Sequence, residues 1–343
     1  MKYRKKKGKK QKAGVKTALV LSGGGAKGAY QVGVIEELLD RGVKFDLVTG
    51  SSIGAFNGAL LAEFINSGLS NQQIIQRYNQ IWREVKDFLR LNWSEFFKYF
   101  FTPFKVSSLF TNKFMKKILK KYIPENRIFS AYNKCQLSVT GTNLNDYELE
   151  VFDFNSRTPV NKAVLASMAY PGALPAVNIN NDFYIDGGTL NNAPLKEAIL
   201  WGAKLIFVVF LTPLKTISGP DHPQEDKKYF SALDVLGNLM DLATDKLMYG
   251  DLKNAVKINK LIKLINQYEK DLPPDFLDKI CELYGLKSGD DKRIIQTIHI
   301  APEEFLEPPG VMGFDKSEAL KKLINVGKKD TGLILDSSKY RGL

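Results

Sequence analysis

The fold is decided by the stretch from Thr17 to Gly54, which reads TALVLSGGGAKGAYQVGVIEELLDRGVKFDLVTGSSIG. Thr17–Leu21 and Phe45–Thr49 are short runs of β-forming residues, while Ala29–Leu39 and Ile53–Ile65 carry apolar residues at helical spacing. A glycine-rich turn follows each strand. This alternation predicts an α/β protein: a three-layer α/β/α sandwich in which a mostly parallel central sheet has helices on both faces.

The rest of the chain fits the same architecture. Gln136–Thr142 and Tyr147–Phe154 alternate apolar and polar residues, which predicts a hairpin across Asn143–Asp146. We expect further helices at Val160–Met168, Pro194–Trp201, residues 229–268 and Lys316–Val326, and further strands at Phe183–Ile185, Leu205–Leu211 and Ile294–Ile300.

The basic residues are concentrated at the start of the sequence. The 343 residues carry a formal net charge of +12, and nine of the 49 Lys and Arg residues lie within residues 1–16, which contain no acid. We expect this segment to be a disordered tail, which either only keeps the protein in solution or is attracted to anionic lipid or nucleic acid. Of these partners we expect an anionic membrane surface and no nucleic acid.

The composition also limits the class of protein. No apolar run approaches the roughly 20 residues that span a bilayer, and Thr17–Leu21 is too short for a secretory signal. Cys135 and Cys281 give neither a disulfide framework nor the spacing of a metal site. We therefore expect a cytoplasmic protein without a metal, either free or peripheral to a membrane.

Residues 70–123 have a helical pattern that is rich in aromatic and basic side chains. Such a segment can lie in a membrane interface or cover a lipid pocket, and aromatic residues at this spacing also pack into ordinary cores. We expect it to be an insertion in a catalytic core formed by residues 17–211. Residues 212–343 are expected to form a mainly helical part packed on that core.

The second glycine turn, Gly50-Ser51-Ser52-Ile53-Gly54, carries a candidate nucleophile. It fits G-x-S-x-G, in which a tight strand-to-helix turn lifts a serine oxygen out of the backbone. Gly50 and Gly54 would let the strand and the helix approach closely. Ser52 is therefore the candidate nucleophile, and a serine that only caps the next helix is the alternative.

The first turn, residues 22–28, presents backbone N–H groups at a helix N-terminus, where negative charge is stabilised. Gly23, Gly25 and Gly28 also match the dinucleotide fingerprint G-x-G-x-x-G, but no acid ends the second strand to hold a ribose. The lysine of a phosphate-binding Walker A loop is absent too. An oxyanion loop remains, with the N–H groups of Gly24 and Gly25 facing the developing charge.

Two bases are compatible with the residue pattern. Asp186-Gly187-Gly188 places a carboxylate on a tight turn after a predicted strand, and burial beside Ser52 would raise its pKa. The chain has only two histidines, His222 and His299. The order Ser52, Asp186, His299 also suits a hydrolase triad, although His299 lies inside a predicted strand.

Four blocks together resemble the patatin-like phospholipase family. They are the two glycine turns, Asp186–Gly188, and Ala166–Pro175 with the sequence ASMAYPGALP, and they occur in the family's order over residues 17–211. Ser22 stands where the family often has Asp, and Leu174 where it usually has an aromatic residue. The resemblance implies a Ser52–Asp186 dyad without histidine, metal or cofactor, and lipid acyl hydrolase activity of the phospholipase A or lysophospholipase type.

The resemblance and the turn chemistry together define the expected site. Ser52 and Asp186 are the catalytic residues, and the oxyanion hole is formed by the N–H groups of Gly24, Gly25 and Ile53. The supporting turn glycines are Gly23, Gly28, Gly50, Gly54, Gly187 and Gly188. Lys27 is either a contact for a lipid head group or a solvated side chain. The alternatives are a catalytically silent lipid- or protein-binding module and a dinucleotide-binding oxidoreductase.

Overall fold

The computed structural model of the chain describes residues 15–85, 108, 110–214, 295–307, 313, 314 and 316–337, with single residues between 250 and 273. Its strands are β1 (Thr17–Leu21), β2 (Leu47–Gly50), β3 (Gln136–Asn143), β4 (Glu148–Phe152), β5 (Val177–Ile179), β6 (Asp182–Asp186), β7 (Leu205–Val209) and β8 (Gln296–Ile300). Its helices are α1 (Gly28–Asp40), α2 (Ile53–Asn66), α3 (Asn71–Glu84), α5 (Lys113–Tyr122), α6 (Val160–Ser167), α7 (Leu195–Leu200) and α11 (Ser317–Asp336), and short 3₁₀ turns are η1 (Gly25–Lys27), η4 (Phe129–Ala131) and η5 (Gly187–Thr189).

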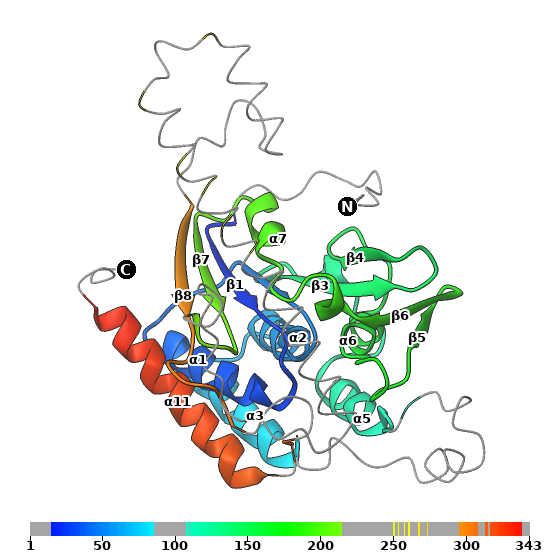
Figure 1. Cartoon of the computed structure of the whole chain (residues 1–343), viewed down its shortest axis with the longest axis horizontal. Coiled ribbons are helices and arrows are strands. Elements are labelled where there is room, and N and C mark those ends of the chain that lie inside the picture. Colours follow the sequence, from blue (N-terminus) through cyan, green and yellow to red (C-terminus); the bar gives the residue numbers. More distant parts are fainter. Residues whose placement is uncertain are drawn as a thin grey trace, which may run out of the picture.

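All eight strands form one sheet, ordered β5-β6-β3-β2-β1-β7-β8, with β4 paired to β3 beside this path (Figure 1). The strands β3, β2, β1, β7 and β8 are parallel to one another. The strands β4 and β6 run antiparallel to β3, and β5 runs antiparallel to β6. The carboxyl ends of β1 and β2 therefore lie at the same edge of the sheet, where the two glycine turns begin.

Helices cover both faces of the sheet, because alternate residues of β1 point to opposite sides. Leu19 and Leu21 belong to the core that includes α1, α2 and α6. Ala18 and Val20 belong to a second core that includes α7. The predicted three-layer α/β/α architecture with a mostly parallel sheet is thus confirmed.

The predicted helix at Lys316–Val326 is ten residues too short, since α11 continues to Asp336. Gly327 lies inside α11, where this helix crosses α1. A Cβ on Gly327 would lie 2.1 Å from the carbonyl oxygen of Tyr30, and one on Gly33 would lie 1.8 Å from that of Ile324. Both glycines are therefore needed for the two helices to approach closely.

Most other predicted elements are confirmed within two residues, including β1 and the hairpin of β3 and β4. The three-residue strand β5 was not predicted. Several predictions lie wholly or mostly outside the described residues: the basic tail, the aromatic segment from residue 86 to 107, and the helices at 229–268, of which only single residues are described. Among the residues that are described, no helix combines the length and the apolar character that crossing a membrane requires.

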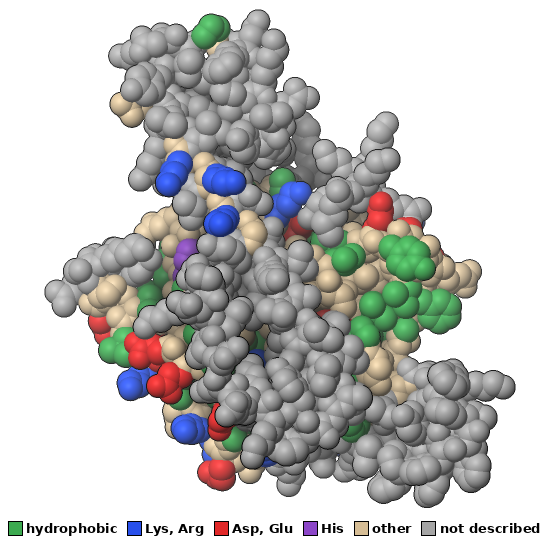
Figure 2. All heavy atoms as spheres, in the orientation of Figure 1, with side chains coloured by type: hydrophobic (Ala, Val, Ile, Leu, Met, Phe, Trp, Pro, Cys, Tyr) green, Lys and Arg blue, Asp and Glu red, His purple; other side chains and the backbone are tan. Residues whose placement is uncertain are grey.

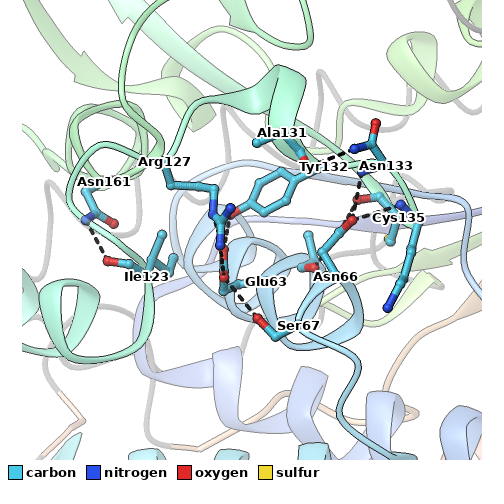
Figure 3. A network of polar contacts seen from close by, with 12 residues as sticks. Glu63, Asn66, Ser67, Ile123, Arg127, Ala131, Tyr132, Asn133, Cys135 and Asn161 are labelled. Atoms are coloured by element: carbon cyan, nitrogen blue, oxygen red, sulfur yellow. Dashed lines mark hydrogen bonds and ion pairs between the residues drawn. The ribbon is translucent and has the colours of Figure 1, made fainter.

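An ion pair between a buried carboxylate and a partly exposed guanidinium holds α2 against the chain that connects α5 with β3 (Figure 3). Glu63, near the end of α2, accepts two hydrogen bonds from the Arg127 guanidinium, at 2.7 and 2.9 Å. Tyr132 OH and Ser67 Oγ donate to the same carboxylate at 3.0 and 3.1 Å. The carbonyl oxygen of Arg127 accepts the N–H of Val160 at 2.8 Å, so this connection also fixes the start of α6.

Apolar side chains also reach the surface on the side of the molecule where β5 and β6 lie (Figure 2). The most exposed large apolar residues near the β3–β4 turn and β6 are Tyr147, Phe183 and Leu144. The N–H of Leu144 donates to the carbonyl oxygen of Phe183 at 2.8 Å, which brings the hairpin turn and β6 together.

Candidate active site

Ser52 lies in the sharp turn between β2 and α2. Its φ of 54° and ψ of −125° place a non-glycine residue in a sparsely populated region, at an expected cost of about 1–3 kcal/mol that the surrounding fold must offset. A Cβ on Gly50 would lie 2.4 Å from the carbonyl oxygen of Gly54, and a Cβ on Gly54 would lie 2.3 Å from that of Leu21. The strand and the helix are thus as close as the G-x-S-x-G pattern indicates.

Ser52 and Asp186 are in direct contact, although 134 residues separate them in the sequence. The Ser52 hydroxyl donates to Asp186 Oδ2 at 2.5 Å. The sheet register explains this meeting: Gly50 pairs with Val139 of β3, and Asp186 pairs with Gly141, two residues further along the same strand. The other carboxylate oxygen, Oδ1, accepts the N–H of Gly188 at 2.8 Å.

The environment of Asp186 favours a carboxyl group that exchanges protons near neutral pH. Its exposed fraction is only 3%, and within the described part of the chain it has no ion-pair partner. Burial raises its pKa from 3.8 to about 7, against the smaller opposing effects of the hydrogen bonds from Ser52 and Gly188. A carboxylate with this pKa is matched to general-base chemistry at physiological pH.

The segment Ala166–Pro175 holds both residues in place. Ser167, the last residue of α6, accepts the backbone N–H of Ser52 on its Oγ at 2.9 Å. The N–H of Asp186 donates to the carbonyl oxygen of Ala169 at 3.0 Å. This role of Ser167 was not predicted from the sequence, because no spacing rule connects Ser167 to Ser52.

The first glycine turn packs directly against Ser52. A Cβ on Gly23 would lie 2.9 Å from Ser52 Cβ. The N–H of Gly23 donates to Asn192 Oδ1 at 2.9 Å, a contact that sequence reasoning missed. Gly24 and Gly25 have φ values of 155° and 58°, which only glycine adopts readily.

Three backbone donors beside Ser52 are unused by the described protein. Gly23 is anchored, but the N–H groups of Gly24, Gly25 and Ile53 donate to no acceptor among the described residues. A set of three next to a serine oxygen is therefore suited to a bound anion or oxyanion.

The remaining predicted glycines lie where side chains have little or no room. A Cβ on Gly28 would lie 2.3 Å from Ile53 Cγ1, one on Gly187 would lie 2.3 Å from Thr140 O, and one on Gly188 would lie 3.1 Å from Asp186 Oδ1. Lys27, also in the first turn, has an exposed fraction of 5%. The alternative of a solvated Lys27 is therefore wrong.

The triad with His299 does not fit the sheet. His299 lies on β8, three strands from β2, which at about 4.8 Å per strand corresponds to about 14 Å. Its ring makes an edge contact with Phe210, with centroids 5.9 Å apart. The Ser52 hydroxyl meets Asp186 with no histidine between them. His222 lies outside the described residues.

Part of this sequence is similar to known proteins. The sequence model of the family described as "Patatin-like phospholipase" matches residues 19–199, more than half of the chain. Lysophospholipase NTE1 of Eremothecium gossypii is 29% identical over 200 residues, which cover 57% of this chain and 12% of that protein. Patatin-like phospholipase domain-containing protein 6 of Mus musculus is 30% identical over 194 residues, covering 56% and 13%.

Among solved structures, VipD of Legionella pneumophila aligns with a TM-score of 0.42 and 14% identity over 94% of this chain and 67% of its own. By contrast, the match to the two curated relatives covers only about an eighth of their length. The family match spans the serine turn, the Ala166–Pro175 segment and the aspartate turn that the structure brings together. The chain belongs to the patatin-like phospholipase family.

Proposed function

We propose that this protein is a serine acyl hydrolase that cleaves fatty-acyl esters of phospholipids or lysophospholipids with a Ser52–Asp186 dyad. The observation that carries the proposal is the 2.5 Å hydrogen bond from Ser52 Oγ to a buried carboxylate whose pKa is raised to about 7. The family match and the names of the two relatives support a lipid ester as the substrate.

The proposed reaction uses only side chains and backbone donors of this chain. Ser52 Oγ forms a bond to the ester carbonyl carbon while its proton passes to Asp186 Oδ2. The N–H groups of Gly24, Gly25 and Ile53 bind the resulting oxyanion, and each such donor typically contributes about 10²–10³ in rate. When the C–O bond breaks, Asp186 returns the proton to the leaving alcohol and the acyl group stays on Ser52.

Water completes the cycle. Asp186 takes a proton from a water molecule that attacks the acyl carbon, and the second tetrahedral oxyanion occupies the same three N–H groups. Collapse of this intermediate breaks the bond to Ser52, which recovers its proton from Asp186 and releases the fatty acid. We further propose that Lys27, beside the oxyanion loop, contacts the phosphate of the head group.

We also propose the organisation in which this chemistry operates. Residues 17–211 form the catalytic core with the aromatic insertion at 70–123, and residues 212–343 pack on that core. The protein is cytoplasmic and peripheral to the membrane from which it takes its substrate, with the basic tail of residues 1–16 contributing to membrane attraction.

The test compares two neighbouring serines in the full chain. Ser52→Ala should lower hydrolysis of a chromogenic acyl ester and of phosphatidylcholine by at least about 10⁴-fold, because it removes the nucleophile. Ser51→Ala is the matched control, because Ser51 belongs to the same turn as Ser52. The Ser51 hydroxyl has no hydrogen-bond partner within the described structure. The Ser51→Ala variant should keep most of the activity.

Other outcomes separate the alternatives. Retention of activity in a folded Ser52→Ala variant would show that the mechanism is wrong, and loss of activity in a folded His299→Ala variant would favour a triad. A wild-type chain that binds lipid but hydrolyses no ester would be a silent binding module. Saturable binding of a dinucleotide would favour the oxidoreductase.

A further inference from the structure

Helix α5 carries a continuous stripe of lysines on its outer face. Its ten residues read KFMKKILKKY, and the stripe consists of Lys113, Lys116, Lys117, Lys120 and Lys121, all of them exposed. Spacings of three and four residues place these side chains on one side of the helix. The opposite side is packed into the core by Met115, Ile118 and Leu119.

The folded protein gains little from this arrangement. Like charges three and four residues apart destabilise a helix, and Lys113 stands in the first turn, where the helix dipole disfavours a cation. The ion pairs that the structure describes are confined to the end of the helix, at Lys120–Glu125 and Lys121–Glu84. Lys113, Lys116 and Lys117 have no acidic partner within the described structure, so their charge is available to a ligand.

The lysine-rich start of α5 is tied to the active-site segment. Phe110, just before α5, donates its N–H to the carbonyl oxygen of Ala173 at 2.9 Å. Ala173 belongs to the Ala166–Pro175 segment, which holds Ser52 and Asp186. At the other end, Asn161 of α6 donates to the carbonyl oxygen of Ile123 at 3.2 Å. The helix α5 therefore runs beside α6 (Figure 1), and Phe110, which precedes it, contacts the Ala166–Pro175 segment.

We propose that the outer face of α5 docks the protein on an anionic phospholipid surface through Lys113, Lys116 and Lys117. The choice of phospholipid over other polyanions rests on the proposed function, since a lipid hydrolase must bring its site to a bilayer. Because the apolar side of α5 is already buried, the contact is electrostatic and does not require insertion of the helix. Docking at this end would present the Ala166–Pro175 segment and the adjacent Ser52 to the lipid.

The experiment uses the full chain with Ser52→Ala, so that vesicles stay intact during the measurement. One variant adds Lys113→Gln, Lys116→Gln and Lys117→Gln, and the matched control adds Lys321→Gln, Lys322→Gln and Lys329→Gln on α11. Both remove three charges from a helix surface and replace them with a residue of similar helix propensity. The surface over α11 mixes acidic and basic side chains (Figure 2), so it has no comparable stripe.

Binding is measured by sedimentation with vesicles of phosphatidylcholine containing phosphatidylglycerol, and with vesicles of phosphatidylcholine alone. Each cation near an anionic surface contributes about a fivefold factor in affinity. The α5 variant should therefore bind the anionic vesicles about 100-fold more weakly, while the α11 variant changes by only a few fold. Binding by the parent should also fall as salt rises from 0.05 to about 0.5 M.

Three results would overturn the proposal: unchanged binding of the α5 variant, equal weakening by both sets of substitutions, or tighter binding of a DNA duplex than of anionic vesicles through the same lysines. The α5 substitutions introduced into the chain that retains Ser52 should leave hydrolysis of a soluble ester unchanged. If the unsubstituted chain, which retains Ser52, does not hydrolyse the soluble ester, the proposed function is contradicted. The vesicle experiment with the Ser52→Ala chains would still decide the docking proposal.

Discussion

Two buried carboxylates lie near opposite ends of α2 and differ in how the protein compensates their charge. Asp186 contacts Ser52 at the start of the helix, and Glu63 lies near its end. Each has an exposed fraction of 3%. Glu63 receives four hydrogen bonds, two of them from a guanidinium. Asp186 accepts two hydrogen bonds, one from the Ser52 hydroxyl and one from the backbone N–H of Gly188, and both donors are neutral.

The comparison shows how one residue class serves two purposes. A carboxylate that is paired with a cation and fully hydrogen-bonded joins segments of the chain. A buried carboxylate without a cation holds its proton more tightly, which is costly for stability and useful for proton transfer. Removing the charge should therefore raise the free energy of unfolding at Asp186 and lower it at Glu63.

The largest expected effect is that of Asp186→Asn. Loss of the base should lower kcat/KM for a soluble ester by about 10³–10⁴-fold. The same substitution should stabilise the fold, whereas Glu63→Gln, the equivalent change at the other end of α2, should destabilise it by about 1–3 kcal/mol. Urea denaturation of both variants at pH 8 measures this difference. If both substitutions lowered the free energy of unfolding, the inference that the buried charge of Asp186 costs stability would be wrong.

The next effect is that of breaking the ion pair from its other side. Arg127→Met leaves the Glu63 charge buried without a cation, which should cost about 3–5 kcal/mol. The double variant with Glu63→Gln should be more stable than Arg127→Met alone, because the isolated charge is gone. Activity per folded molecule should stay within a few fold of the parent in both. A double variant less stable than the single one would contradict this account.

The third prediction concerns pH. As the proposed base, Asp186 must be ionised to accept a proton, so kcat/KM should fall about tenfold per pH unit below its pKa of about 7. Since this pKa is raised above its ordinary value of 3.8, the folded state retains the proton longer than the unfolded chain. The contribution of Asp186 to stability should therefore decrease as pH rises from about 4 to about 7, by roughly 4 kcal/mol in all.

Asp186→Asn provides the control for the pH prediction. Stability should be measured in urea at intervals between pH 4 and pH 8, and the difference between parent and variant should grow in favour of the variant over this range. A difference that is constant with pH would contradict the assignment of the raised pKa to Asp186.

The smallest expected effect is that of Ser167→Ala, which leaves both carboxylates in place. Its hydroxyl accepts the N–H of Ser52, so its loss should allow the strained turn to relax. We expect kcat to fall about tenfold to 100-fold with little change in KM, because misplacement of the nucleophile affects the chemical step. Ser167→Thr keeps the acceptor and should recover part of the loss. A change in KM alone would indicate a role in substrate binding instead.

Strands, helices and turns that depend on a few neighbouring residues could be predicted from the sequence, whereas contacts between distant segments could not. The strand β1 and the turn at Ser52 follow from composition and spacing over a few residues. The contacts of Ser167 and Asn192 did not, because each joins segments more than 100 residues apart. The helix at Lys316–Val326 was predicted too short, and the close approach that requires glycine at position 327 involves another helix, at Tyr30. Asp186 was found through its turn and through the resemblance together.

The crossing of α1 and α11 has a consequence for the biosynthesis of the protein. Tyr30 of α1 donates a hydrogen bond to Asp330 of α11 across 300 residues of sequence. On the ribosome, α1 emerges well before α11, so the face of α1 that α11 covers waits for this partner. Contacts of such high sequence separation form late and slow the folding reaction. The helix α1 therefore completes its packing only after α11 has been translated, and the nascent chain exposes an apolar surface that chaperones can bind until then.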